Sequence, residues 1–285
     1  SYVFKNTEHA ANLFGLKELG NIYTRIGNPT QDVFEQRISQ LEGGAASLAL
    51  ASGTSAIFYA IITLARAGDE IVSANNLYGG TYTQFDAILP SLGIKVNFVD
   101  PKDPENFQKA ITEKTRAIFV ETIGNPTLDV VDIQKIADVA HRNGLPLIAD
   151  ATFSTPYLLQ TIQHGADIVI NSLTKWIGGH GTGIGGSITD SGKFDWKGGR
   201  HPLFTEPDPN YHGLRWALDL PEPLAPLAFI LRARTVPLRN LGAAISPDNA
   251  WIFLQGIETL PLRIIRHSEN ASRVAQHLDK HPKVS

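Results

Sequence analysis

The chain contains no cysteine and no methionine among its 285 residues. The absence of cysteine excludes disulfide bonds, thiolate nucleophiles and sulfur-bound metal sites. The absence of methionine, with Ser1 in place of a start residue, suggests a trimmed or deliberately sulfur-free sequence. Chemistry that depends on protein sulfur is therefore excluded as a basis for function.

Long apolar runs and blocks of basic residues are lacking as well. The longest uninterrupted apolar run, Leu224–Leu231, contains Pro226 and is far shorter than the roughly 20 residues that span a bilayer. No charged-then-apolar leader of the secretory kind opens the sequence, so a cytoplasmic enzyme is the default expectation. The net charge of −3 without a basic block argues against a nucleic-acid surface, whose affinity rests on clustered Lys and Arg.

Apolar residues make up 42% of the chain, which is enough to bury a sizeable core. Short apolar, β-rich stretches recur along the sequence and are mostly separated by segments of helical length. This alternation is typical of an α/β fold with a mainly parallel sheet sandwiched by helices. The predicted strands are Ala46–Ala51, Glu70–Ala74, Lys95–Val99, Arg116–Glu121, Pro146–Ala149, Asp167–Asn171 and Gly183–Ile188.

Helices are predicted from apolar spacing between these strands. Apolar residues from Ile133 to Ala140 recur at i, i+3, i+4 and i+7, and a second helix over 56–66 would open at Thr54 or Ser55. Residues 193–226 lack periodicity and are rich in Pro, Gly and aromatic residues, which indicates a long ordered excursion. A final helical stretch is predicted from about 249 to 281.

Lys175 lies in the run 171–181, which combines one amine, two hydroxyls and a glycine-rich exit. An amine attacks a carbonyl only when neutral, and lysine is the side chain whose pKa moves readily on burial or beside other cations. Ser172 and Thr174 stand two apart, so on an extended segment both would point toward one phosphate. The combination suggests a Schiff base with pyridoxal 5′-phosphate. Taken alone, a lysine after an apolar stretch is more often the solvated end of a strand.

Three further loops follow predicted strands, and open α/β sheets bind ligands at the carboxyl ends of their strands. Gly53 and Thr54 lead into a helix whose free N–H groups would favour a phosphate, although an ordinary N-cap explains them equally well. Asp150 could hold a proton on a pyridine nitrogen or could cap a turn. Tyr78, followed by two glycines, could stack on a flat ring or belong to the core.

Two patterns are rejected as functional motifs. Residues 181–186 satisfy G-x-G-x-x-G, but a dinucleotide fingerprint follows a strand and opens a helix, whereas this run leads into a predicted strand. His277 and His281 stand four apart, yet they lack the further ligands of a complete metal site. No nicotinamide cofactor and no metal are therefore expected.

Five motifs occur in order, span most of the chain, and together resemble the Cys/Met-metabolism family of pyridoxal-phosphate enzymes. These motifs are Tyr23–Thr30, Leu77–Thr81, Glu121–Pro126, Asp150–Thr152 and Ser172–Lys175. The resemblance implies the large domain of fold-type I pyridoxal-phosphate enzymes over 46–248, with an insert at about 193–226. It also implies an N-terminal arm over 1–45 whose start is missing, and a linking helix over 249–285 to an absent C-terminal domain.

The resemblance implies a role for each site residue. Lys175 would form the Schiff base and move protons, Asp150 would pair with the pyridine nitrogen, and Tyr78 would stack on the ring. Tyr23 and Arg25 would complete the phosphate site of a neighbouring subunit, so a homo-oligomer, such as a dimer of dimers, is implied. The other residues expected to hold the cofactor are Gly53, Thr54, Asn125, Thr152, Ser172 and Thr174.

Within the family, residues 194–196 and 204–213 resemble the longer insert of the O-acetylhomoserine sulfhydrylase branch more than that of the gamma-lyases. This implies gamma-replacement on O-acetyl-L-homoserine by sulfide or a small thiol, giving homocysteine or a thioether, and acetate. Two alternatives stay open: a gamma-lyase of the same family, and an inactive cofactor-binding fragment that lacks the family's C-terminal carboxylate-binding arginine. The chain also departs from the family at Ala151, where asparagine is usual.

Overall fold

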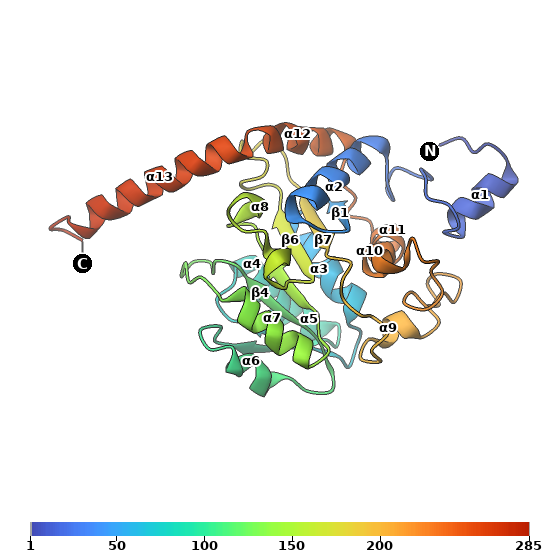
Figure 1. Cartoon of the computed structure of the whole chain (residues 1–285), viewed down its shortest axis with the longest axis horizontal. Helices are drawn as coiled ribbons and strands as arrows, with labels where there is room; N and C mark the ends of the chain where they lie inside the picture. The colour runs from blue at the N-terminus through green and yellow to red at the C-terminus, as the bar shows by residue number, and fades with distance from the viewer. Residues whose placement is uncertain (1, 285) are drawn as a thin grey trace.

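The computed structural model describes residues 2–284 and shows a central sheet with helices packed around it (Figure 1). Within these residues the sheet has seven strands in the order β1-β7-β6-β5-β4-β2-β3. β7 runs antiparallel to both of its neighbours, and the other pairs are parallel. The predicted mainly parallel sheet is therefore confirmed. The strands are β1 (Ala46–Leu50), β2 (Glu70–Ala74), β3 (Lys95–Val99), β4 (Thr115–Glu121), β5 (Leu147–Asp150), β6 (Ile168–Ser172) and β7 (Gly186–Asp190).

Most of the strands are joined through helices. The α-helices of the described residues are α1 (Thr7–Phe14), α2 (Pro29–Glu42), α3 (Gly53–Leu64), α4 (Gly79–Thr83), α5 (Leu89–Ser91), α6 (Glu105–Ala110), α7 (Ile133–Arg142), α8 (Thr155–Leu158), α9 (Pro202–Thr205), α10 (Ala228–Ala233), α11 (Arg239–Leu241), α12 (Pro247–Glu258) and α13 (Leu260–Asp279). Shorter turns are η1 (Gln84–Ile88) and η4 (Arg234–Leu238), which are π-helical, and η2 (Thr161–His164) and η3 (Ala225–Leu227), which are 3₁₀.

Local sequence signals set where the helices beside the site begin and end. The Ser52 side chain caps α3 by accepting the N–H of Ser55 at 3.1 Å, so the cap lies before the predicted Thr54 or Ser55. Asn28 caps α2 in the same way, with Pro29 at the first helical position. Gly43 ends α2 with φ of 73°, a conformation that glycine adopts without steric cost.

β1 separates two apolar cores, because alternate side chains of a strand point to opposite faces. Leu48 and Leu50 pack into the larger core, which contains residues of α3 and α10. Ala49 packs into the smaller core between α2 and α12, together with Leu173 from the segment after β6. Both faces of the sheet are thus covered, and the end of β6 is held between packed helices.

The segment over 193–226 is ordered without long helices, as predicted. Its buried Trp216 donates an indole N–H to Asp208 at 2.9 Å, and Asp208 also pairs with buried Arg232 at 3.2 Å. Aromatic packing and this buried pair therefore replace regular secondary structure there. Only α9 and η3 interrupt it among the described residues.

The predicted final helix is two helices, α12 and α13, which meet at Thr259. The prediction of one continuous helix is wrong because Pro261 lies at the start of α13, where its missing N–H is tolerated, and not inside a helix. Figure 1 shows α13 projecting away from the rest of the chain. None of the helices over 2–284 combines the length and apolarity that crossing a bilayer requires.

Candidate active site

Three neighbouring parallel strands, β4, β5 and β6, end in polar residues at the same edge of the sheet. β4 ends at Glu121, β5 at Asp150 and β6 at Ser172, and Glu121 stands in register opposite Asp150. The predicted placement of Asp150 at a strand end is confirmed. This is the edge at which open α/β sheets bind ligands.

Hydrogen bonds from backbone N–H groups to side-chain oxygens tie the ends of β5 and β6 together. The Thr152 N–H donates to Asp150 Oδ1 at 2.9 Å, and the Ser172 N–H donates to Thr152 Oγ1 at 2.7 Å. Thr152 therefore fixes the carboxylate of Asp150 relative to Ser172. Three sequence-predicted residues thus lie in one connected group.

The N-terminus of α3 packs directly on Ser172. A Cβ added at Gly53 would lie 2.6 Å from the Ser172 Cβ and 2.9 Å from its Oγ, so only glycine fits there. The next residue, Thr54, is exposed, and its hydroxyl lies 3.0 Å from that of Ser52. Hydroxyls and the free N–H groups of a helix N-terminus therefore meet at the end of β6, which is the donor set that a phosphate needs.

Lys175 lies three residues beyond Ser172 and is itself exposed, in a turn whose Leu173 and Ile177 are buried. Its backbone N–H donates to the Ser172 carbonyl at 3.2 Å, and its own carbonyl accepts from Gly179 at 2.7 Å. The turn thus places the amine beside the end of β6 while leaving the side chain free to reach a bound molecule.

Thr174 corrects one step of the sequence argument. β6 ends at Ser172, so Thr174 lies in the turn and the two hydroxyls do not share an extended segment. The Thr174 hydroxyl instead accepts the Gly185 N–H at 3.1 Å and ties the turn to the segment before β7. Its contact with a phosphate stays a prediction.

Tyr78 precedes α4, and its side chain is 49% exposed. Its backbone N–H donates to Glu121 Oε1 at 2.7 Å, which places the tyrosine beside the edge that carries Asp150. A Cβ at Gly80 would lie 2.6 Å from the Tyr78 ring, so the glycine permits this ring position. Both amide atoms of the neighbouring Asn76 are buried without a partner among the described residues.

A buried carboxylate, Glu121, and a half-buried one, Asp150, meet at this edge. Burial, and after it the charge of Asp150, raise the pKa of Glu121 to about 8, against the backbone N–H groups of Tyr78 and Asn125, which lower it. Burial also raises the pKa of Asp150, against its hydrogen bonds from Thr152. Two facing carboxylates favour a shared proton or a nearby cation, and a protonated pyridine nitrogen is such a cation.

Tyr23 and Arg25 lie outside this group. The Arg25 guanidinium stacks over the Tyr23 ring at 5.2 Å and donates to the carbonyl of Arg239. Within residues 2–284, neither side chain forms a hydrogen bond or an ion pair with Lys175. Their expected action on the site of a neighbouring subunit stays a prediction.

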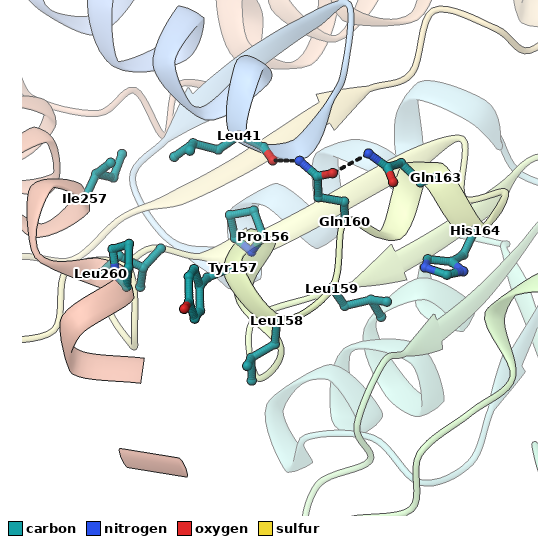
Figure 2. A pocket seen from close by; sticks show the side chains of 11 residues that line it. Leu41, Pro156, Tyr157, Leu158, Leu159, Gln160, Gln163, His164, Ile257 and Leu260 are labelled. Carbon is teal, nitrogen blue, oxygen red and sulfur yellow. Dashed lines mark hydrogen bonds between the residues drawn. The ribbon is translucent and has the colours of Figure 1, made fainter. Parts of the chain in front are cut away.

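Two cavities of the described residues lie away from this edge. One, of about 400 Å³, lies between the end of α2, α8, η2 and the junction of α12 with α13. Figure 2 shows its lining, in which Gln160 donates to the Leu41 carbonyl at 2.9 Å. The other, of about 630 Å³, lies between the N-terminal segment, α2 and α10. Neither is lined by Lys175 or Asp150.

The structure places the two rejected motifs as follows. The run over 181–186 leads into β7, as predicted, and not into a helix. The rings of His277 and His281 lie 5.7 Å apart, and no cluster of three potential metal ligands occurs among the described residues. Ala151 is fully buried in the larger core.

The residues present fit pyridoxal 5′-phosphate. The close approach of Gly53 to Ser172 leaves the α3 N-terminus and nearby hydroxyls for the phosphate. Asp150 offers a carboxylate for a cationic ring, and Lys175 offers an exposed amine. Asn76 adds buried, unpartnered polar atoms near Tyr78.

Gly53→Ala is expected to weaken this arrangement, because the new methyl group would press on Ser172. Overpacking of this kind costs typically about 1–3 kcal/mol. Thermal unfolding and pyridoxal-phosphate titration should both show the loss. Gly79→Ala is the matched control, since a Cβ there meets nothing within 4 Å. Equal behaviour of the two variants would contradict the proposed close packing.

The sequence assigns no role to three residues that contribute to the site: Ser52, Asn76 and Glu121. Ser52 precedes Thr54 and Ser55, the predicted caps, and the buried, unpartnered amide of Asn76 is visible only in the structure. Glu121 lies within one of the family motifs. Its signal was available, because it closes a predicted strand in the same way as Asp150 closes the next one.

Comparison with known proteins places these residues in context. A family model described as Cys/Met metabolism PLP-dependent enzyme matches residues 1–285. An O-acetyl-L-homoserine sulfhydrylase from Leptospira meyeri is 57% identical over 288 aligned residues, which cover 100% of this chain and 65% of that protein. A homocysteine synthase from Schizosaccharomyces pombe is 53% identical, with 100% and 66% covered. The chain therefore spans slightly less than two thirds of these curated relatives.

A solved structure shares the fold over the whole chain. It is a putative O-acetylhomoserine (thiol)-lyase from Campylobacter jejuni, described with N′-pyridoxyl-lysine-5′-monophosphate. The TM-score is 0.95 at 42% identity, covering 100% of this chain and 70% of that one. The likeness confirms the predicted fold-type I architecture.

Proposed function

We propose that this chain, which belongs to the family of Cys/Met metabolism PLP-dependent enzymes, is the cofactor-binding part of an enzyme that performs gamma-replacement on O-acetyl-L-homoserine. Sulfide or a small thiol would replace acetate and give homocysteine or a thioether. The family resemblance drawn from the sequence motifs is confirmed by the match over residues 1–285. The substrate proposal is supported by the relatives' names, O-acetyl-L-homoserine sulfhydrylase and homocysteine synthase.

One observation carries the proposal: the connected group of Asp150, Thr152 and Ser172 stands between the α3 N-terminus and the turn of Lys175. It sets a carboxylate, phosphate donors and an amine along one edge. Pyridoxal phosphate, when bound, supplies an electron sink that acidifies the substrate carbon next to the amino group. The rest of the reaction falls to side chains of the chain.

Each side chain then has a distinct task. Asp150 would hold a proton at the pyridine nitrogen, because a facing carboxylate favours the cationic form. The Lys175 Nζ would take the proton from the substrate Cα, give that proton up again as an acid, and only then take one from Cβ. Tyr78 would cover one face of the ring and exclude water from it.

Expulsion of acetate from Cγ follows from the second of these deprotonations. Sulfide or a thiol then adds to the unsaturated carbon, which distinguishes replacement from elimination. One lysine suffices for both proton transfers, since binding fixes Cα and Cβ within its reach. Ser172, Thr54 and Gly53 would hold the phosphate and so fix the position of the reacting carbons relative to Lys175.

Borohydride trapping tests the proposal. The purified chain is incubated with pyridoxal phosphate, reduced, digested and mapped by mass spectrometry, with selective labelling of Lys175 expected. Scattered or absent labelling would contradict the proposed site. The unreduced chain with bound pyridoxal phosphate should convert O-acetyl-L-homoserine to homocysteine only when sulfide is added. Formation of 2-oxobutanoate and ammonia without a thiol would indicate a gamma-lyase instead.

We also propose that the active form is a homo-oligomer in which Tyr23 and Arg25 serve the phosphate site of a neighbouring copy. The support is the exposure of Tyr23 and the distance of both residues in sequence from the site, together with the family resemblance. Tyr23 is 45% exposed, and its ring contacts the half-buried Arg25. Light scattering that gives the mass of one chain in the presence of cofactor would contradict this proposal.

A further inference from the structure

Glu121 is a buried carboxylate that the reaction described above does not use. It ends β4 and is 5% exposed. Two segments leave the sheet edge beside it: the one before α4, which carries Tyr78, and the one after β4, which carries Asn125. By the proposed function Tyr78 covers one face of the cofactor ring, and the family resemblance implies that Asn125 helps to hold the cofactor, so the relative position of the two residues matters.

Both segments bring a backbone N–H close to the Glu121 side chain. The Tyr78 N–H donates to Oε1 at 2.7 Å, and the backbone N–H of Asn125 is near enough to this carboxylate to lower its pKa. Glu121 therefore connects two loops: that of Tyr78, which is 43 residues earlier in the sequence, and that of Asn125, which directly follows β4. An ionised or neutral carboxyl oxygen accepts such bonds, whereas an apolar side chain would leave both N–H groups unsatisfied.

We propose that Glu121 is a positioning residue, which holds Tyr78 and Asn125 in place on either side of the cofactor ring and fixes both relative to Asp150. The proposal rests on the proposed function for the identity of the ring. Glu121 itself touches neither substrate nor cofactor. It acts through the backbone of Tyr78 and Asn125, which contact the cofactor by the proposed function.

The location of Glu121 supports a positioning role over simple packing. Glu121 on β4 stands in register with Asp150 on β5, the residue proposed to pair with the ring nitrogen. The loops of Tyr78 and Asn125 are therefore attached to the strand that neighbours Asp150. The charge of Asp150 acts on Glu121 and raises its pKa. A cation held by Asp150 would offset that charge and lower the pKa of Glu121, which strengthens its acceptance of both N–H bonds as the cofactor binds.

Hydrogen exchange of the chain without cofactor tests the connection itself. In the unmodified chain, peptides covering 75–82 and 122–128 should exchange more slowly than exposed loops. Glu121→Ala should speed exchange in both peptides, and Glu121→Gln should restore protection, because the amide oxygen still accepts. Titration with pyridoxal phosphate should show affinity weakened about tenfold or more in Glu121→Ala, from the lost pre-organisation, and near normal in Glu121→Gln.

Glu70→Ala is the matched control. Glu70 is another buried carboxylate, but it begins β2 at the opposite end of the sheet, where it accepts from Asn97 and Thr112 at 3.0 Å each. Its loss should lower the melting temperature without changing cofactor affinity or exchange in the two peptides.

Several results would overturn the positioning role. They are fast exchange of both peptides in the unmodified chain, unchanged exchange in Glu121→Ala, or an equal loss of affinity in Glu70→Ala. The first of these needs no variant, so a Glu121→Ala chain that fails to fold leaves the proposal open to refutation. If the unmodified chain binds no pyridoxal phosphate, the proposed function fails, and the exchange measurements still decide whether Glu121 fixes the two loops.

Discussion

Replacing Lys175 by alanine is expected to abolish covalent capture of pyridoxal phosphate after borohydride reduction. The exposed lysine lies in the turn that follows β6, next to the Ser172 and α3 N-terminal donors, and no other lysine lies within that turn. Where the unmodified chain turns over substrate, the variant should lose at least about 10³-fold in rate, because general acid–base catalysis alone contributes typically 10²–10⁴-fold. Mass spectrometry of the reduced digest and a coupled product assay measure the two effects.

Lys135→Ala provides the control for this loss. Lys135 is an exposed lysine on α7 that pairs with Asp132 at 3.0 Å, and its removal should leave labelling and rate unchanged. Lys175→Ala should still bind pyridoxal phosphate non-covalently, since the phosphate donors are untouched. Retained covalent labelling at one other lysine in Lys175→Ala, with retained activity, would contradict the assignment of Lys175 as the reacting amine.

The fold was predictable from the sequence because its signals are local and repeated. β2 and β3 have the bounds that were predicted from their apolar runs, and the remaining strands differ by a few residues at their ends. What local pattern could not supply is the pairing of β7. It runs antiparallel between β1 and β6, because its direction depends on the course of the chain from 173 to 185 and not on its own residues.

The candidate site was predictable where one residue carries its own chemistry. Lys175, Asp150 and Gly53 were found from residue type and position after a strand. Contacts between distant segments were not predictable in this way: the bond from Tyr78 to Glu121 joins segments far apart in sequence. Thr174 shows the reverse error, since an extended segment was assumed to continue past Ser172, where the chain turns.

Glu42, at the end of α2, is a fully buried carboxylate that contacts the strand residue next to Ser172. Its Oε1 accepts from Asn171 Nδ2 at 2.6 Å, and Asn171 immediately precedes Ser172 in β6. Its Oε2 and the Asn171 Oδ1 are both buried without a partner among the described residues. Two acceptors without a donor indicate a missing proton, and a proton on Glu42 would satisfy the pair.

Burial raises the pKa of Glu42 from its ordinary 4.5 to about 7, against the hydrogen bond from Asn171, which lowers it. Below pH 4.5 the carboxyl is protonated in both folded and unfolded chains, so its contribution to stability is fully present. Between 4.5 and 7 the unfolded chain loses the proton first, and the free energy of unfolding falls as pH rises. Above about 7 the loss is complete and is on the order of 3 kcal/mol.

Glu42→Gln is therefore expected to be more stable relative to the unmodified chain at pH 8 than at pH 5, by about 2–3 kcal/mol. The glutamine amide replaces the acid as donor to Asn171 and does not ionise. Denaturant unfolding at the two pH values measures the difference. Burial also raises the pKa of Asp190 to about 7, so the variant retains part of the pH dependence.

Glu258→Gln is the control for this experiment, because Glu258 is an exposed glutamate paired with Arg37 on the surface. Its substitution should leave the difference in unfolding free energy between pH 5 and pH 8 as in the unmodified chain. If Glu42→Gln also leaves that difference unchanged, then Glu42 is ionised in the folded chain at pH 8 without cost. In that case a donor other than a proton on Glu42, such as a bound water, must satisfy the Asn171 and Glu42 oxygens, because a buried carboxylate is stable only when it is hydrogen-bonded.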